Sequence, residues 1–261
     1  MEIQWALVLF TLLTGMAGWT FFFTGLNEFT QKSTKDGFMP GIVSICLLAA
    51  GALASVFHLA HPDRIMGALG HPTSGIFTEF VLVMLLGLAI LVYLICVKRK
   101  AAGAAKVCAV LGMALGVLIS FMVGYSYLMV GRAAWDTILL PLCYLGTAVP
   151  MGACLYSVLA FPDGLSGMFD KLCIRVSGVV AALTLLIYGI ATNLFSGNGT
   201  VYLICALICS AIVPLVCSYA TGDKASKSVR WVMVIAVIAG ALLFRVMMWV
   251  VGTGFYNLLG Y

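Results

Sequence analysis

Eight long apolar stretches divide the chain, and this repetition constrains its fold more than any other feature. A helix needs about 20 largely apolar residues to cross a bilayer, where it satisfies its own backbone hydrogen bonds. We therefore predict an all-α, polytopic membrane protein with a bundle of eight transmembrane helices. A single transmembrane domain is expected over residues 1–261, with spans at about 5–26, 40–59, 75–97, 107–129, 137–161, 174–195, 201–220 and 231–256.

The composition supports this class of protein. Hydrophobic residues make up 63% of the chain and charged residues 9%, whereas soluble domains have about 25% charged residues. The first apolar run follows the sequence MEIQW, which lacks the basic residues of a signal peptide. No small-residue cleavage site stands out after that run, so we expect it to be a retained span. Pro141 and Pro150 fall inside the fifth span and predict a kink there.

Lysine and arginine are distributed unevenly between the two sets of connecting loops. Arg64 and Arg132 lie in one set, and Arg245 lies within the last span. The other eleven of the 14 basic residues belong to the opposite set: Lys32, Lys35, Lys98, Arg99, Lys100, Lys106, Lys171, Arg175, Lys224, Lys227 and Arg230. Because cytoplasmic loops carry an excess of these residues, we expect both termini on the outer, periplasmic side. The same asymmetry accounts for the net charge of +5 without a nucleic-acid partner.

Ionisable residues gather in the stretch Val56–Phe80. It holds Glu79 and all three histidines of the chain, His58, His61 and His71. His58 lies near the outer end of the second span, and Glu79 lies near the outer end of the third. Spans joined by a short loop are usually antiparallel neighbours, so we expect these two side chains at similar depth. Ionisable groups inside a membrane are functional candidates by default.

The pair formed by His58 and Glu79 suits the oxidation of a quinol. A quinol gives up two electrons and two protons, so it needs hydrogen-bond partners at its oxygens and a base for the protons. A carboxylate shielded from water and a histidine can both take up protons near neutral pH. Two alternatives stay open. Glu79 could be a first-turn acid stabilised by the helix dipole, and His58 could be an interfacial histidine bonded to a carbonyl.

Metal and haem sites are not expected. The three histidines and nearby carboxylates have no zinc-ligand spacing. Only His58 lies in or near a span, so a haem held by two transmembrane histidines is not expected either. The nine cysteines contain no Cys-x-x-Cys pair, and iron–sulfur clusters need grouped thiolates. We therefore expect no cluster in this chain and interpret the cysteines as small buried hydrophobic residues.

Further candidates lie at the same outer end of the spans. Arg245 should face the bundle interior, because an unpaired arginine in lipid is costly, and Glu79 and Asp136 are its expected partners. A structural ion pair is the alternative role for Arg245. A group at the outer end of the fourth span and in the loop after it could line a quinone cavity or form an interfacial aromatic belt; its members are Tyr125, Tyr127, Arg132, Trp135 and Asp136. Beside Glu79 and His58, the candidate quinone-binding residues are Arg245, Arg64, Tyr125, Trp135 and Asp136.

Two motifs give the chain a resemblance to a known family. They are FHLAHPDRIMGALGHPTSGIFTEF, up to the start of the third span, and WDTILLPLCYLGTAVPMG around the fifth. With eight spans and both termini outside, the chain resembles the membrane anchor subunit of dimethyl sulfoxide reductase, the DmsC family. In that family a His-Leu pair is followed by Pro-x-Arg and then by a glutamate at the entry to a span. Here these are His58-Leu59, Pro62-Asp63-Arg64 and Glu79.

The resemblance implies a haem-free anchor in the bacterial inner (cytoplasmic) membrane that binds menaquinol in anaerobic respiration. Electrons would pass to an iron–sulfur subunit and then to a molybdopterin catalytic subunit, which reduces the terminal acceptor. The chain itself would support menaquinol oxidation but not acceptor reduction. His58 and Glu79 match the histidine and the glutamate that the family uses for quinol binding or oxidation.

Two other classes of function remain. A secondary transporter would fit the proline-containing spans, but transporters carry their ionisable groups near the membrane midplane. In this sequence those groups gather at one face. A purely structural anchor would have no redox site, and it predicts that Glu79 can be neutralised without loss of turnover.

Overall fold

The structure, a computed structural model, describes residues 2–30, 37–57, 74–161, 168–197, 199–220 and 226–252. Within these ranges the protein is helical and has no strand. Its elements are α1 (Trp5–Thr30), α2 (Phe38–Val56), α3 (Gly75–Lys98), α4 (Ala102–Tyr125), α5 (Leu139–Ala160), α6 (Met168–Ala191), η2 (Leu194–Ser196), α7 (Thr200–Leu207), η3 (Ile208–Ile212), α8 (Val213–Ala220) and α9 (Lys227–Val251). Eight helical segments of the described residues are long and apolar enough to cross a membrane, as predicted.

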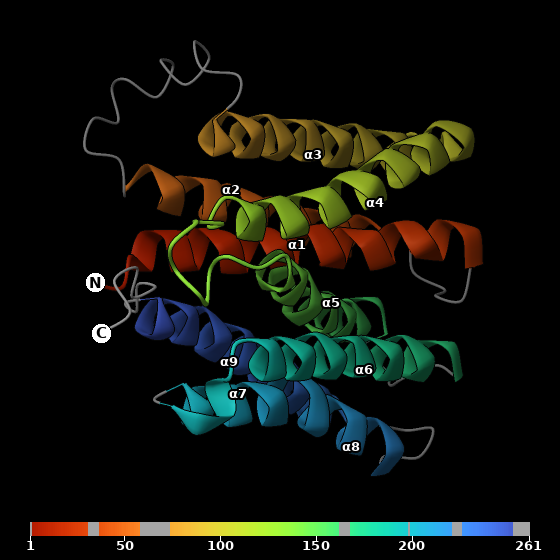
Figure 1. Ribbon diagram of the computed structural model, residues 1–261. Helices are drawn as coiled ribbons and strands as arrows, with labels where there is room; N and C mark the ends of the chain where they lie inside the picture. Colours follow the sequence, from red (N-terminus) through yellow and green to blue (C-terminus); the bar gives the residue numbers. More distant parts are fainter. Residues whose placement is uncertain are drawn as a thin grey trace.

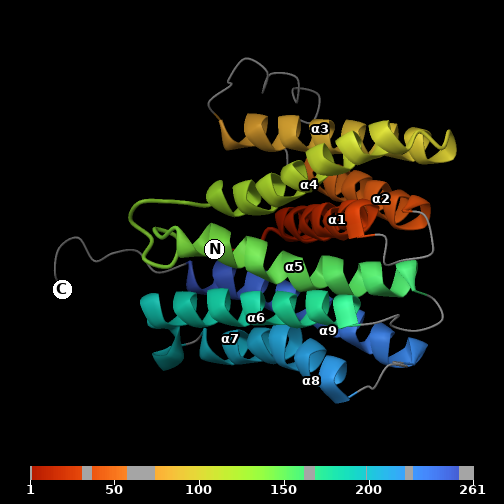
Figure 2. The same ribbon diagram turned by 90° about the vertical axis from the view of Figure 1, so that its right-hand side faces the viewer.

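The helices run roughly parallel or antiparallel in one bundle (Figures 1 and 2). α3 lies along one edge and α7 with α8 along the opposite edge, with α1 and α5 between them. α1 packs against α2, α4 and α5, and α5 packs against α1, α4, α6 and α9. α1 and α5 are consequently the two most enclosed spans, while the other helices present apolar side chains to the outside of the bundle.

Small residues and local hydrogen bonds allow α1 to occupy the centre. Its backbone meets α4 at Gly18 and Gly116, where a Cβ on Gly18 would lie 2.9 Å from the Gly116 Cα. The buried hydroxyls of Thr14, Thr20 and Thr24 donate to backbone carbonyls four residues earlier in α1, at 2.7, 2.7 and 2.8 Å. These polar side chains are therefore satisfied within the helix that carries them.

Prolines affect the spans less uniformly than the sequence suggested. Pro141 is the third residue of α5, where a backbone N–H would have no helical partner in any case, so it does not interrupt that helix. Pro150 lies inside α5. Pro214 follows a five-residue π-helical segment, η3, that divides the seventh span. A proline ring clashes with the carbonyl four residues earlier, and a wider π turn is one way to relieve that clash.

Several span boundaries differ from the prediction, most clearly those of α4 and α6. α4 begins at Ala102 and ends at Tyr125, whereas the hydrophobic window ran from 107 to 129. Alanine is the strongest helix former, so the Ala-rich segment before Lys106 is helical although it is not strongly apolar. Similarly, α6 spans Met168–Ala191, whereas residues 174–195 were predicted. The start of α1 and the end of α9 lie at the same end of the bundle (Figure 1), and which side of the membrane that end faces stays a prediction.

Candidate functional site

Glu79 lies in the second turn of α3, at the end of the bundle where α1 begins. Ser74 caps the helix by accepting a 3.1 Å hydrogen bond from the Phe77 N–H. The first turn of α3 holds no acidic residue, and the stabilising effect of the helix dipole on acids falls off beyond that turn. A role for Glu79 as a first-turn acid therefore has little physical support.

The Glu79 carboxylate is half-buried and faces the protein. It is on the same face of α3 as Leu86 and Ile90, both fully buried, because residues spaced by three to four fall on one side of a helix. The side chain of Ser126, just after α4, interacts with it, while the Ser126 hydroxyl donates to the Met122 carbonyl at 3.1 Å. The carboxylate is thus held at the junction of α3 with the loop that leads from α4 to α5.

Two tyrosines lie close to this carboxylate. The rings of Tyr127 and Tyr144 stack with centroids 5.6 Å apart and an interplanar angle of 16°. Both phenols interact electrostatically with Glu79 and with each other. Burial raises the pKa of Tyr127 well above its ordinary value, and the neighbouring Tyr144 and Glu79 raise it further. Tyr127 therefore stays a neutral hydrogen-bond donor in the physiological pH range.

Arg245 lies against Tyr144 and is completely buried. Its guanidinium carbon lies 4.9 Å from the centroid of the Tyr144 ring. Its Nε donates to the Thr11 hydroxyl at 3.0 Å, its Nη2 to the Thr11 carbonyl at 3.1 Å, and its Nη1 to the Ala241 carbonyl at 2.9 Å. A weaker contact of 3.5 Å joins Nη1 to the Thr147 hydroxyl. The arginine is therefore held by neutral groups from three helices.

The prediction that Arg245 pairs with Glu79 or Asp136 was wrong. Within the described part of the chain Arg245 forms no ion pair, either with Glu79 or with Asp136. Asp136 is exposed, and the guanidinium of Arg245 contacts the face of the Tyr144 ring instead. A cation–π contact can partly replace a counter-ion, since the face of an aromatic ring carries negative electrostatic potential.

Glu79, Tyr144 and Arg245 lie at similar depths in the bundle. A helix rises about 1.5 Å per residue. Glu79 is four residues from the start of α3, Tyr144 five from the start of α5, and Arg245 six from the end of α9. They consequently lie about 6, 8 and 9 Å from the helix ends at that face of the bundle. The cluster sits below one surface of the bundle and not at its middle.

Aromatic side chains surround the tyrosines. Trp135 is buried, and its indole N–H donates to the Met248 carbonyl at 2.9 Å. Its ring centroid lies 5.9 Å from that of Tyr127 and 5.4 Å from that of Trp249. Trp249 in turn lies 5.9 Å from Tyr127. Trp135 thus belongs to the cluster, although it reaches Glu79 only through Tyr127.

The remaining sequence candidates are distributed differently. Tyr125 is 48% exposed and stacks on Phe121 of its own helix, as expected of an interfacial aromatic residue. Asp136 is exposed on the loop before α5. His58 and Arg64 lie outside the described residues. No group of three potential metal ligands occurs among the residues that the structure describes.

Ser126 and Tyr144 were missed by sequence reasoning, and Tyr127 was noticed only as one member of an aromatic group. A single tyrosine within an apolar run, such as Tyr144 in PLCYLG, is a common core residue and gives no signal by itself. Its significance comes from α5 and α9 packing together, which brings the Tyr144 ring against Arg245.

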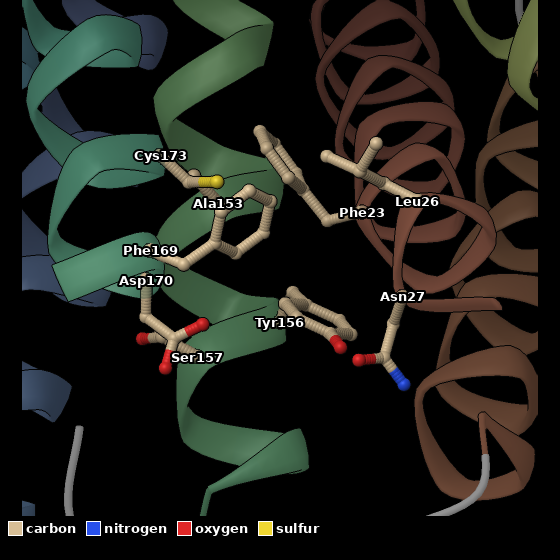
Figure 3. A pocket seen from close by; sticks show the side chains of 9 residues that line it. All are labelled: Phe23, Leu26, Asn27, Ala153, Tyr156, Ser157, Phe169, Asp170 and Cys173. Carbon is tan, nitrogen blue, oxygen red and sulfur yellow. The ribbon is translucent and has the colours of Figure 1, made fainter. Parts of the chain in front are cut away.

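A small cavity lies at the opposite end of the bundle, between α1, α5 and α6 (Figure 3). The Tyr156 hydroxyl and the Asn27 amide point toward one another there, and Asp170 lies on the other side of the cavity. A separate apolar groove between α3 and α4 is lined by Leu88, Val92 and their neighbours. That groove lies on the face of α3 away from Glu79, so both features are distinct from the cluster.

Eight spans with a carboxylate, phenols and a buried arginine beneath one surface define an integral membrane protein with a polar site near a membrane face. The family model for the DMSO reductase anchor subunit (DmsC) matches residues 1–198, which include Glu79, Tyr127 and Tyr144. The chain therefore belongs to the DMSO reductase anchor subunit family, and the resemblance noted in the sequence is confirmed. Family membership implies a membrane anchor of a DMSO reductase-type complex. A comparison with curated proteins found no match.

Proposed function

We propose that this chain anchors a DMSO reductase-type complex and oxidises menaquinol at the Glu79 end of the bundle. The observation that carries the proposal is the position of Glu79, a half-buried carboxylate that interacts with the Ser126 side chain and with two phenols. A carboxylate so placed can act as a general base toward a ligand that enters from the lipid. The inner membrane of a bacterium is the compartment in which this activity belongs.

The proposed reaction converts menaquinol to menaquinone. Two O–H bonds of the headgroup break, and two protons and two electrons leave it. Glu79 accepts one proton, and His58 binds the headgroup and receives the other. The electrons pass to the clusters of an iron–sulfur subunit and from there to a molybdopterin catalytic subunit, which reduces the terminal acceptor. In this scheme the chain binds no iron–sulfur cluster of its own.

We also propose that the anchor contains no haem. All three histidines of the chain lie between residues 58 and 71. A haem held by one histidine from each of two facing spans is therefore not expected. Purified anchor should show no b-type bands in a reduced-minus-oxidised spectrum. Stoichiometric haem absorbance would overturn this part of the proposal.

Two alternatives make different predictions. A secondary transporter should keep its charged groups near the membrane midplane, whereas Glu79, Tyr144 and Arg245 lie near one end. A purely structural anchor fits the family equally well but assigns no chemistry to Glu79.

Glu79→Gln separates the two anchor hypotheses. Glutamine keeps the shape of glutamate but cannot accept a proton, so loss of the base should slow menaquinol oxidation by about 10²–10⁴. Glu28→Gln is a matched control, because Glu28 is a carboxylate at the other end of the bundle that accepts a 2.6 Å hydrogen bond from Tyr93. Turnover with menaquinol is measured in membranes that contain the assembled complex. An artificial donor that reduces the iron–sulfur subunit directly reports on assembly.

The expected result is loss of menaquinol oxidation in Glu79→Gln alone, with the artificial donor still active. His58→Ala should behave similarly through weaker quinol binding. Normal menaquinol oxidation by Glu79→Gln would end the redox proposal and favour the structural anchor. Loss of activity with both donors would mean that the variant failed to assemble, and Glu79→Asp then tests the same role with the carboxylate retained.

A further inference from the structure

We propose that the phenols of Tyr127 and Tyr144 bind the headgroup oxygen that gives its proton to Glu79, with Arg245 positioning Tyr144. This inference rests on the proposed quinol oxidation and names additional residues for it. The ligand class is an aromatic diol and its dione product. Neither tyrosine belongs to the His-Leu, Pro-x-Arg and Glu pattern of the family, although Tyr144 lies within the second motif, WDTILLPLCYLGTAVPMG.

Both phenols can receive a ligand oxygen. Neither hydroxyl forms a hydrogen bond with a residue that the structure describes, and Tyr127 is only half-buried. Tyr188, a fully buried tyrosine, instead donates to the Ala134 carbonyl at 2.7 Å. A bound oxygen atom between the phenols and Glu79 would give both hydroxyls a partner.

A third unused donor lies in the same cluster. The indole N–H of Trp249 is buried and has no hydrogen-bond partner among the described residues, and its ring touches Tyr127. The neighbouring Trp135, by contrast, donates to the Met248 carbonyl. The indole of Trp249 and the phenol of Tyr127 thus lie together, and an electron-rich ligand oxygen would supply an acceptor for the indole N–H.

The phenol hydroxyls suit both redox states of the ligand. A phenol hydroxyl can both donate and accept a hydrogen bond, so it can bind a quinol O–H and equally the carbonyl oxygen of the quinone product. When the quinol loses its proton, negative charge develops on that oxygen. Neutral donors already aimed at such an oxygen stabilise the charge without reorganising. The raised pKa of Tyr127 keeps that phenol protonated and able to donate.

Arg245 holds this arrangement from behind. It contacts the face of Tyr144, and its hydrogen bonds to Thr11 and to the Ala241 carbonyl fix the guanidinium plane. Tyr144 then stacks on Tyr127. Arg245 has no expected contact with the ligand, so it is a positioning residue that acts through Tyr144.

The test uses the purified complex in detergent with Tyr127→Phe and Tyr144→Phe, which keep the rings and remove one hydroxyl each. The probe is a methyl-substituted naphthoquinone without a prenyl tail, and its dissociation constant is measured by calorimetry. Loss of one hydrogen bond should weaken binding by about two- to tenfold in each variant. The turnover number with the corresponding naphthoquinol should fall by about 10²-fold, because the charged oxygen depends on the donor more than the ground state does.

Tyr219→Phe is the control, because Tyr219 is 67% exposed in α8, at the other end of the bundle, and it should bind the probe as the wild type does. Arg245→Lys should raise the dissociation constant in the wild-type background but not in Tyr144→Phe, a result that a merely structural role would not give. Wild-type affinity in both tyrosine variants, with Glu79→Gln inactive, would overturn this inference and leave the proposed function intact. A wild-type complex that neither binds the probe nor oxidises the quinol would overturn both.

Discussion

The guanidinium of Arg245 lies on the face of Tyr144, 4.9 Å from its ring centroid, in the interior of a transmembrane bundle. Its hydrogen bonds all go to hydroxyl and carbonyl oxygens, on Thr11, Thr147 and Ala241. A buried charge is costly unless its hydrogen bonds are satisfied, so this set of contacts must be kept almost complete. The relationship makes Arg245 a sensitive point of the fold.

Arg245→Lys should destabilise the protein. The lysine ammonium is a compact charge on a flexible stem and cannot reproduce the planar fork of arginine. It cannot reach the Thr11 hydroxyl, the Thr11 carbonyl and the Ala241 carbonyl together. Since a hydrogen bond to a charged group contributes about 1.5–3 kcal/mol, we expect a clear fall in melting temperature in detergent. Arg99→Lys, at an exposed position, serves as the control, and equal melting temperatures for the two variants would contradict the prediction.

Gly116→Ala should separate α1 from α4. A Cβ at Gly116 would lie 2.6 Å from the Gly18 carbonyl oxygen, and this neighbour is backbone that cannot rotate away. Overpacking of a tight contact costs about 1–3 kcal/mol, which a denaturant titration can measure. Gly103→Ala is the matched control in the same helix, because a Cβ there meets nothing within 4 Å. Destabilisation of similar size in both variants would show that the close approach of α1 and α4 is not the cause.

The membrane orientation can be tested with reporter fusions. Eleven of the 14 basic residues lie in or beside the connections α1–α2, α3–α4, α5–α6 and α8–α9, opposite Glu79, and the positive-inside rule assigns that end to the cytoplasm. A periplasmic phosphatase fused to the C-terminus should therefore be active, and a cytoplasmic fluorophore fused there should be dark. The same pair of reporters in the loop between Lys98 and Lys106 should give the reverse result. The opposite pattern at both sites would refute the orientation.

The sequence predicted the spans well because hydrophobic length alone defines them. All eight are present, and the position of Glu79 near the start of the third follows directly from where that apolar run begins. Burial of Arg245 was also predictable, since lipid is a poor environment for a guanidinium. These conclusions depend on one segment at a time and on its surroundings in a bilayer.

Contacts between segments were much less predictable. The proposed pairing of Arg245 with Glu79 or Asp136 assumed that opposite charges meet, but Thr11, from the first span, takes the hydrogen bonds instead. Threonine at that position looks like an ordinary helix residue in the sequence. Tyr144 likewise gains its role only from the packing of α5 against α9. The prediction for His58 lies outside the described residues and stays a prediction.

The threonines of α1 have a consequence for how the protein enters the membrane. α1 and α5 are the least apolar of the eight spans, and both end up surrounded by protein. α1 is nevertheless synthesised before α2, α4 and α5, the helices that cover it. Because Thr14, Thr20 and Thr24 donate to carbonyls of their own helix, their hydroxyls are already hydrogen-bonded while α1 is still surrounded by lipid. α5 follows α1 and α4 in the chain, so it can pack against these helices as it enters the bilayer.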